Sequence, residues 1–407
     1  MLNKIKKGLK SIGPGFIIAA VVLGPGSITV ASRIGSEHGY AFLWVIVLAA
    51  ISMMAYTAMG ARFGVVNKQS ILQTITDQYG RWFAVLIGIS AFFSASSFQF
   101  GNNLGIGIGM REITGVDERV WPIVFTALAI ILIFLAKDLY KVIEKLMLVM
   151  VMIIIISFIF NLILTKPEVV PLVKGFVPHI FELENLDIIA ALVATTFALQ
   201  AALYQSYLVQ DKGWKLESLK KSLGDSYMGI LMLSLISILV IITSAAALRP
   251  HGIIVNSAAD MAMQLESLFG SSAKIVFSLG LCAAAFSSLM VNSVIGGGLL
   301  SDGLGLGRSM NEKMPKVFTI SILVLGMLIA VFFQGNVIYA LIMAQASTIF
   351  AVPLIAIGLY LVLNNKNIMG KYRNNKVQNS LAIFGFILIS IMVYYMYTKL
   401  IGFLASL

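Results

Sequence analysis

Charged residues are scarce in this sequence. Asp, Glu, Lys and Arg make up 12% of its 407 residues, whereas a soluble domain carries about 25%. The single cysteine, Cys282, excludes an internal disulfide. The three histidines, His38, His179 and His251, fall in separate predicted loops, which excludes a zinc-type cluster. No acid or histidine lies near the centre of a long apolar run, so we expect neither an enzyme nor a resident cofactor.

Apolar residues, in contrast, are abundant and arranged in long runs. Hydrophobic residues make up 59% of the chain, and the mean hydropathy is +0.95. Runs near the length that crosses a bilayer occupy residues 13–34, 40–61, 82–109, 121–136, 143–164, 187–209, 227–247, 273–300, 317–334, 337–363 and 380–405. The pattern predicts an all-α integral membrane protein with about eleven transmembrane helices.

The basic residues fall mainly in alternate loops between these runs. Lysines precede the first run, and further basic clusters lie at residues 62–81, 137–145, 212–221, 308–316 and 366–376. Cytoplasmic loops carry such an excess of Lys and Arg. We therefore expect a multi-pass protein of the inner or plasma membrane, with a cytoplasmic N-terminus and a C-terminus outside. This distribution explains the formal charge of +11 without a nucleic-acid partner. The expected partners are the lipid bilayer and a small transported solute, and the expected state is a monomer.

The first run contains a sequence that a continuous helix accommodates poorly. Residues 24–27 read Gly-Pro-Gly-Ser in the middle of the apolar stretch 13–35. Proline has no N–H to donate, and glycine loses the most backbone freedom when a helix fixes it. We expect two half-helices, with free carbonyls on the first and free N–H groups on the second. Such breaks form substrate sites in secondary transporters, although a proline kink without a ligand is the alternative.

The order of the runs predicts two related halves. Runs 1–5 and 6–10 enter the membrane from opposite faces, as in transporters with a five-plus-five inverted repeat. We expect one transporter domain over 1–407, with a first repeat at 11–164, a second at 187–363 and an extra helix at 380–405. The sixth run would then pair with the broken first run. Its centre, 194–206, is rich in small, hydroxyl and glutamine residues but has no Gly or Pro, so its break stays open, and a polar seam between helices is the alternative.

Three stretches resemble the Nramp family of divalent-metal transporters. The first 64 residues contain Gly13-Pro14-Gly15-Phe16, the 24–27 break and Gly39-Tyr40-Ala41-Phe42-Leu43-Trp44, at the family's spacing from the break to the Gly-Tyr pair. The eighth run contains Leu281-Cys282-Ala283-Ala284-Ala285-Phe286-Ser287-Ser288, and Asn364-Asn365-Lys366-Asn367-Ile368-Met369-Gly370-Lys371-Tyr372 precedes the last run. The resemblance implies a LeuT-type fold and transport of a divalent metal cation.

Several positions depart from the pattern of that family. Gly24 stands where the family has a metal-ligating aspartate, and Ser27 where it has an asparagine ligand. The family's Met-Pro-His in span 6 corresponds to Ala198, Leu199 and Gln200, its span 3 acid to Gln99, and its span 8 glutamine to Phe286. Bare transition-metal ions need carboxylate, His or Met ligands. We therefore expect an altered metal site, without the family's proton coupling through titratable groups in the membrane.

Two functions remain open from these residues. In the first, carbonyls at Gly24 and Gly26 and the side chains of Ser27, Thr196 and Gln200 hold a largely hydrated cation such as Mg²⁺, or Mn²⁺. Gly24, Ser27 and Gln200 are its predicted metal ligands. The full predicted substrate-binding set is Gly24, Gly26, Ser27, Thr196, Ala198, Gln200, Gln99 and Asn102.

In the second, the N–H groups near Gly26 and Ser27 bind the carboxylate of a small organic solute such as an amino acid. Phe197, Phe286, Ala198 and Tyr204 would then shape an organic pocket, with ordinary core packing as the alternative for the aromatic rings. A transporter fold that acts only as a sensor ranks last, because no soluble domain accompanies it.

Overall fold

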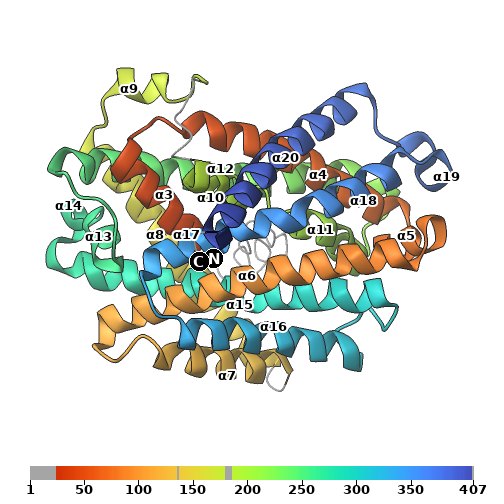
Figure 1. Cartoon of the computed structure of the whole chain (residues 1–407), viewed down its shortest axis with the longest axis horizontal. Coiled ribbons are helices and arrows are strands. Elements are labelled where there is room, and N and C mark those ends of the chain that lie inside the picture. The colour runs from red at the N-terminus through yellow and green to blue at the C-terminus, as the bar shows by residue number, and fades with distance from the viewer. Residues whose placement is uncertain (1–23, 135–136, 179–185, 406–407) are drawn as a thin grey trace, which may run out of the picture.

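The computed structural model describes residues 24–134, 137–178 and 186–405, and every element among them is a helix (Figure 1). The long helices form one bundle. They are α4 (Leu43–Val66), α6 (Arg81–Thr114), α7 (Val120–Phe134), α8 (Lys137–Thr165), α12 (Leu219–Ala247), α15 (Ala273–Leu304), α16 (Lys313–Phe332) and α20 (Lys376–Ala405).

Shorter helices form the half-spans and the loops. The half-spans are α3 (Pro25–His38), α10 (Leu186–Thr196), α11 (Leu199–Asp211), α17 (Val337–Ser347) and α18 (Val352–Asn364). The loop helices are α5 (Ile71–Tyr79), α9 (Val169–Lys174), α13 (Ala258–Met263), α14 (Glu266–Phe269) and α19 (Lys366–Met369). Single 3₁₀ turns are η2 (Leu216–Ser218), η3 (Arg249–His251), η4 (Gly270–Ser272), η5 (Thr348–Ala351) and η6 (Gly370–Tyr372).

Each of the eleven predicted runs contains a helix. Eight helices of the described residues are long and apolar enough to cross a membrane, and two shorter apolar helices lie at Val120–Phe134 and Val151–Thr165. Of the first run, α3 is the second half; the Gly13–Phe16 motif and the expected first half-helix lie outside the described residues. The prediction of an all-helical membrane protein is confirmed.

The two ends of the bundle carry different loops. Figure 1 shows α9, α13 and α14 at one end and α5 and α19 at the other. This agrees with spans that alternate in direction. The basic stretches at residues 62–81 and 366–376 contain α5 and α19 and so lie at this end. The excess of Lys and Arg predicts that this end faces the cytoplasm.

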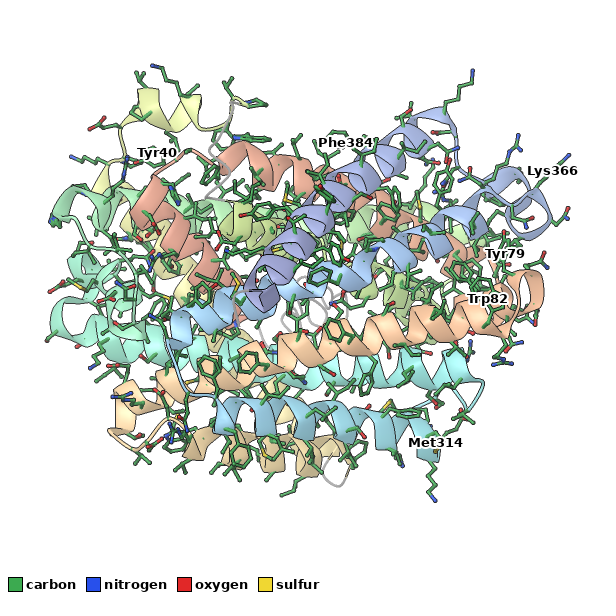
Figure 2. The ribbon with its side chains drawn as sticks, in the orientation of Figure 1. Tyr40, Tyr79, Trp82, Met314, Lys366 and Phe384 are labelled. Atoms are coloured by element: carbon green, nitrogen blue, oxygen red, sulfur yellow. The ribbon has the colours of Figure 1, made fainter. Side chains whose placement is uncertain are left out.

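The flanks of the bundle are apolar. Large side chains such as Phe93, Leu235 and Ile387 are about half exposed, and Phe384 projects from α20 (Figure 2). A soluble protein rarely leaves so much apolar surface uncovered, so these side chains face lipid. Tyr79 and Trp82 lie at one end of the bundle and Tyr40 at the other (Figure 2), as interfacial aromatic residues do.

Two interruptions lie within predicted spans. Between α10 and α11, Ala198 has φ −84° and ψ 81°, which is not helical. The break that the sequence left open in span 6 is therefore present, although no Gly or Pro marks it. Span 10 is also interrupted, because α17 ends at Ser347 and η5 precedes α18. The sequence analysis missed this second interruption.

Glycines allow the central helices to approach closely. A Cβ at Gly303 of α15 would lie 2.6 Å from the Ala84 carbonyl oxygen of α6. A Cβ at Gly64 of α4 would lie 2.6 Å from the Ser206 carbonyl oxygen of α11. Small residues at such contacts let backbones pack closely within a membrane. These contacts hold α6 against α15 and α11 against α4, and so position the residues around both breaks.

Candidate functional site

The α3 break is a short extended segment followed by a helix N-terminus. Gly24 is extended, with φ −106° and ψ 178°, and Pro25 opens the helix. Pro fits there because the first N–H groups of a helix have no partner inside it. The Gly24 carbonyl accepts from the Ile28 N–H at 3.3 Å. No acid lies in the first turn, so no carboxylate of that turn offsets the positive end of this half-helix.

Two polar side chains from other helices lie against Gly24. A Cβ at this position would be 3.0 Å from Oδ1 of Asn102 on α6 and 3.2 Å from Oγ of Ser288 on α15. Both side chains are fully buried. The structure thus brings the predicted residues Gly24 and Asn102 together. Ser288, which the sequence analysis quoted only as part of a motif, joins them.

A chain of hydrogen bonds runs from this point into α6 and α15. The Asn102 Nδ2 donates to Gln99 Oε1 at 3.0 Å, and the Gln99 Nε2 donates to the Leu289 carbonyl. The Asn292 Nδ2 donates to Ser288 Oγ at 3.0 Å. Gln99, predicted as an outlying site residue, is therefore linked to the break by its hydrogen bond with Asn102.

Gln345 of α17 fills the other side of the half-helix. Its amide occupies the space in which a side chain at Gly26 would lie, and its Nε2 is 2.9 Å from a Cβ built at Gly101. Its Oε1 is buried and has no hydrogen-bond partner among the described residues. The sequence analysis missed this residue, although a lone glutamine inside the apolar run 337–363 was a usable signal.

The span 6 break carries further unpaired polar atoms. In the part of the chain that the structure describes, Thr196 Oγ1 and both amide atoms of Gln200 have no hydrogen-bond partner, and both residues are buried. Ala198 is buried between them. The three atoms nearest a Cβ built at Gly24 belong to Asn102 and Ser288, not to Thr196 or Gln200. The site therefore has two polar groups of residues, one at each break.

The aromatic residues predicted to line an organic pocket pack on other rings. The Phe197 ring lies 5.5 Å from that of Tyr56, and the Phe286 ring lies 5.1 Å from that of Phe125. Tyr204 stacks on Tyr207 at 5.3 Å. These contacts favour the alternative of core packing.

Buried charged side chains are few in the part of the chain that the structure describes. Among the described residues, no cluster of three or more His, Cys, Asp or Glu side chains could hold a metal ion. The buried charged residues there are Arg62, near the end of α4, and Asp302, near the end of α15. Arg62 donates to Gln378 at 2.6 Å and to Asn374 at 2.7 Å. The breaks can therefore offer dipoles and lone pairs rather than carboxylates.

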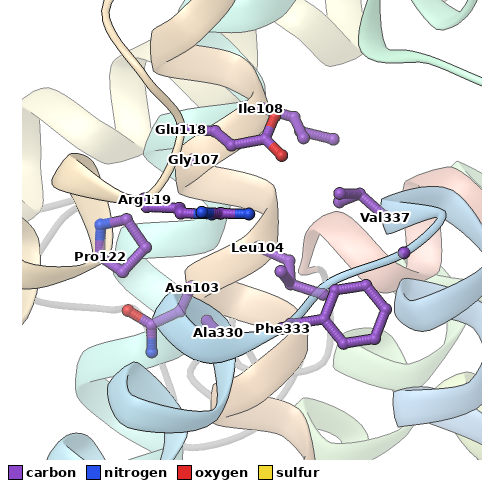
Figure 3. A pocket seen from close by; sticks show the side chains of 11 residues that line it. Asn103, Leu104, Gly107, Ile108, Glu118, Arg119, Pro122, Ala330, Phe333 and Val337 are labelled. Atoms are coloured by element: carbon purple, nitrogen blue, oxygen red, sulfur yellow. The ribbon is translucent and has the colours of Figure 1, made fainter.

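A small separate pocket lies on another face of α6. It holds about 50 Å³, between α6, the start of α7 and the α16–α17 loop. Figure 3 shows Asn103 and Glu118 at opposite ends, with the Arg119 side chain between them. Thr126 Oγ1 donates to Asn103 Oδ1 at 3.3 Å, so this amide is satisfied. The pocket has room for a few waters and does not include Asn102.

A larger, open pocket of about 490 Å³ lies where α3 and α9 end. His38, Tyr40, Lys174 and Arg249 line it. Burial lowers the pKa of His38 below its ordinary value of 6.5; Glu37 opposes this shift, and the cationic Arg249 adds to it. This pocket is predominantly basic and lies apart from the breaks.

Comparison with known proteins decides the family. Residues 15–399 match the model of the Nramp family, described as natural resistance-associated macrophage protein-like. The chain is a member of the Nramp family.

Relatives of this Nramp protein are divalent-metal transporters. The divalent metal cation transporter MntH of Klebsiella pneumoniae is 24% identical over 378 residues, which cover 92% of this chain and 90% of that protein. The structure of the Eremococcus coleocola manganese transporter, in complex with an aromatic bis-isothiourea substituted compound, matches with a TM-score of 0.78 at 17% identity. That match covers 94% of this chain and 86% of the other.

A match to MhsT in complex with L-phenylalanine has a TM-score of 0.61 at 16% identity and covers 94% and 97% of the two chains. The fold is therefore LeuT-type.

Five of the seven departures from the Nramp pattern fall at the breaks, and the other two, Gln99 and Phe286, lie within α6 and α15. Gly24 is the last residue before α3, and Ser27 lies in its buried first turn. Ala198 is the non-helical residue of the second break, and Gln200 lies in the first turn of α11. These four departures thus lie at the two helix breaks.

Proposed function

We propose that this Nramp protein moves a divalent metal cation, Mg²⁺ or Mn²⁺, that keeps most of its water, and that it does so without the proton coupling of its family. The observation that carries the proposal is the neutral, oxygen-bearing lining of the Gly24 break in a member of a metal-transporting family. We further propose that the protein is monomeric in the cell membrane, with the α5 end in the cytoplasm and the C-terminus outside.

The polar atoms without partners support a cation. Asn102 Oδ1, Gln345 Oε1 and Thr196 Oγ1 are buried oxygens with no hydrogen-bond partner among the described residues. Oxygens are the ligands that hard dications prefer, and Mg²⁺ commonly binds through retained waters. Neutral oxygens compensate poorly for the loss of a whole hydration shell. A hydrated dication therefore suits the site better than a bare transition-metal ion.

The amides at the family's titratable positions support uncoupled transport. Gln99 and Gln200 carry no proton that titrates near neutral pH, and both are buried. Their positions therefore cannot bind a proton along with the cation. The membrane potential remains as a driving force, at about 2.3 kcal/mol per elementary charge per 100 mV, doubled for a dication.

A second candidate is an organic solute with a carboxylate. Neither α3 nor α11 has an acid in its first turn, so both positive helix ends are uncompensated there. The Gln200 Nε2 is a buried donor without a partner among the described residues. The fold is shared with MhsT, whose structure holds L-phenylalanine. An amino acid is the cargo that these groups would recognise.

A transport panel separates the two candidates. The purified protein is reconstituted in liposomes, and uptake of Mg²⁺, Mn²⁺ and a mixed amino-acid pool is compared. Gly24→Phe, which fills the space next to Asn102 and Ser288, serves as the blocked variant after its folding is confirmed by size-exclusion chromatography. We expect divalent-cation uptake by the wild type and none by Gly24→Phe. Amino-acid uptake without cation uptake would establish the second candidate instead.

The Gly24→Asp and Ala198→Met double variant extends the panel. It returns a carboxylate and a thioether to the positions where the family carries its ligands. If the breaks hold the cation, this variant gains affinity for Mn²⁺, because charged and soft ligands bind transition metals more tightly than neutral oxygens.

A further inference from the structure

The orientation of one buried amide decides which charge the Gly24 break accepts. An asparagine side chain has a donor nitrogen and an acceptor oxygen, and rotation by 180° exchanges them. If Asn102 presented its nitrogen to the break, the site would favour an anion. If it presented its oxygen, the site would favour a cation. The surrounding hydrogen bonds allow only one of these orientations.

The constraint begins at a backbone carbonyl. The Leu289 carbonyl can only accept, so the Gln99 amide must direct Nε2 toward it, as it does. The other atom of that amide, Oε1, can then only accept from Asn102, whose Nδ2 donates to it at 3.0 Å. Rotating either amide would bring two unprotonated oxygens together in a buried place, which costs far more than the bond is worth.

The backbone of Gln99, which carries the first amide of this relay, is held firmly. The Asn103 Nδ2 donates to the Gln99 carbonyl oxygen at 2.9 Å. Gly326 of α16 packs on the same residue, since a Cβ there would be 2.8 Å from the Gln99 carbonyl carbon. Gln99 is also completely buried. A side chain fixed by packing and hydrogen bonds can orient the next residue with precision.

The relay leaves one atom free, and it lies at the break. Asn102 Oδ1 has no hydrogen-bond partner among the described residues, its residue is 1% exposed, and it is 3.0 Å from the Gly24 Cβ position. An unsatisfied buried acceptor is costly and calls for a ligand or a donor. The Nδ2 atom of the same amide bonds to Gln99, and Oδ1 is the atom that lies beside the extended segment.

We propose that Asn102 binds the transported cation through Oδ1, and that Gln99 is a positioning residue that keeps this oxygen directed at the break. The inference rests on the proposed cation transport and deepens it, because it names a ligand and gives a reason for cation over anion selectivity. The proposed ligand, Asn102, belongs to α6. It takes the role of the side-chain ligand that Gly24 lacks. The Asn102 dipole repels a carboxylate, so the same arrangement acts against the organic-anion alternative.

The test uses the symmetry of a carboxylate. Asn102→Asp puts two equivalent oxygens where the amide has one, so it needs no relay to present an acceptor. One of these oxygens would face Gln99 Oε1, so the variant is also made in a Gln99→Leu background, where that contact is absent. We expect Asn102→Asp to raise the affinity for Mg²⁺ and Mn²⁺ about tenfold, since site charge tunes cation affinity. Asn102→Leu should abolish saturable binding. Binding is measured by calorimetry on the purified protein, and transport in liposomes.

Gln99→Leu separates positioning from structure. In the wild-type background it frees Asn102 to rotate, and we expect cation affinity to fall severalfold. In the Asn102→Asp background we expect Gln99→Leu not to lower the affinity, because it removes the oxygen that faces the new carboxylate. An equal loss in both backgrounds would mean that Gln99 serves only packing and would overturn its positioning role.

Asn161→Leu is the matched control for the loss of a buried amide. Asn161 is buried in α8, its Nδ2 donates to the Gln264 carbonyl at 2.6 Å, and its Oδ1 accepts from Ser267 at 2.5 Å. This variant should lose thermal stability and keep its cation affinity. If wild-type protein transports divalent cations while both Asn102 variants leave affinity unchanged, the ligand assignment is wrong and the proposed function stands. If the wild type binds and moves no divalent cation, both fail.

Discussion

The Tyr207 hydroxyl of α11 donates a hydrogen bond of 2.5 Å to the Asp302 carboxylate of α15, and both residues are buried. Near the end of α11, the Gln210 Nε2 donates to the carbonyl oxygens of Asn67 and Gln69 in the α4–α5 loop, at 2.9 and 2.8 Å. At the same end of α11, Gln210 accepts from Arg308 at 3.2 Å. The second half of the broken span 6 is thus tied to α15 and to the α4–α5 loop away from the break.

Tyr207→Phe removes the hydrogen bond and keeps the ring. We expect it to destabilise the protein by about 1–3 kcal/mol, because a buried carboxylate loses a donor. Thermal unfolding in detergent measures the loss. Tyr204→Phe is the control, since the Tyr204 hydroxyl has no hydrogen bond to any residue that the structure describes. A Tyr207→Phe protein as stable as Tyr204→Phe would show that the bond contributes nothing.

Gly60→Ala tests the close packing of α4 on α11. A Cβ at Gly60 would collide with the Ala202 carbonyl oxygen, which cannot rotate away. We expect a loss of about 1–3 kcal/mol. The control is Gly224→Ala in α12, where nothing lies within 4 Å and alanine should stabilise the helix by roughly 0.5–1 kcal/mol. Opposite shifts in melting temperature are predicted, and equal shifts would contradict the packing.

Gly26→Ala tests the fit of Gln345 against α3. The new methyl group would occupy the place of the Gln345 amide, so we expect the variant to fold with reduced stability and to lose cation uptake. Adding Gln345→Ala to Gly26→Ala makes room for the methyl group. The double variant should therefore be about as stable as Gln345→Ala alone. If the two changes are additive in thermal stability, the residues are not coupled.

Hydrophobic length was enough to predict an all-helical membrane protein, because it is a local property of a membrane span. The LeuT-type fold was predicted from the resemblance to the Nramp family, and the orientation inferred from loop charge stays a prediction. The sequence could not decide the span 6 break, since Ala198 has no intrinsic tendency to leave a helix and departs from one only in the folded bundle. It also missed the interruption at η5, although Pro353, the second residue of α18, lies inside the apolar run 337–363 and was an available sign.

The candidate site was predicted less completely. The resemblance placed Gly24, Ser27 and Gln200 at the breaks, which is where the structure has them. Their role as ligands stays a prediction. Ser288 and Gln345 reach the α3 break from helices more than 250 residues away along the chain. Contacts between such distant residues depend on helix packing and leave no periodic signal in one sequence.

His38 gives the stability a pH dependence. Its pKa is lowered by burial, so between that pKa and 6.5 the unfolded chain binds more protons than the folded one. Stability is therefore present above the unfolded pKa and lost as pH falls through the folded one. Melting temperatures at about pH 7.5 and about pH 5.5 should differ more for the wild type than for His38→Gln. His251→Gln, at an exposed position in η3, should retain the wild-type difference.

The most direct test of the central claim is cation flux under a clamped membrane potential. Liposomes with an internal Mg²⁺ indicator and an external proton indicator are given an inside-negative potential, once with equal pH on both sides and once with an acidic exterior. A neutral site that binds a hydrated dication predicts Mg²⁺ uptake that grows with the potential, is equal in both pH conditions and carries no protons. Uptake that requires the acidic exterior, or that moves protons with each ion, would contradict the account.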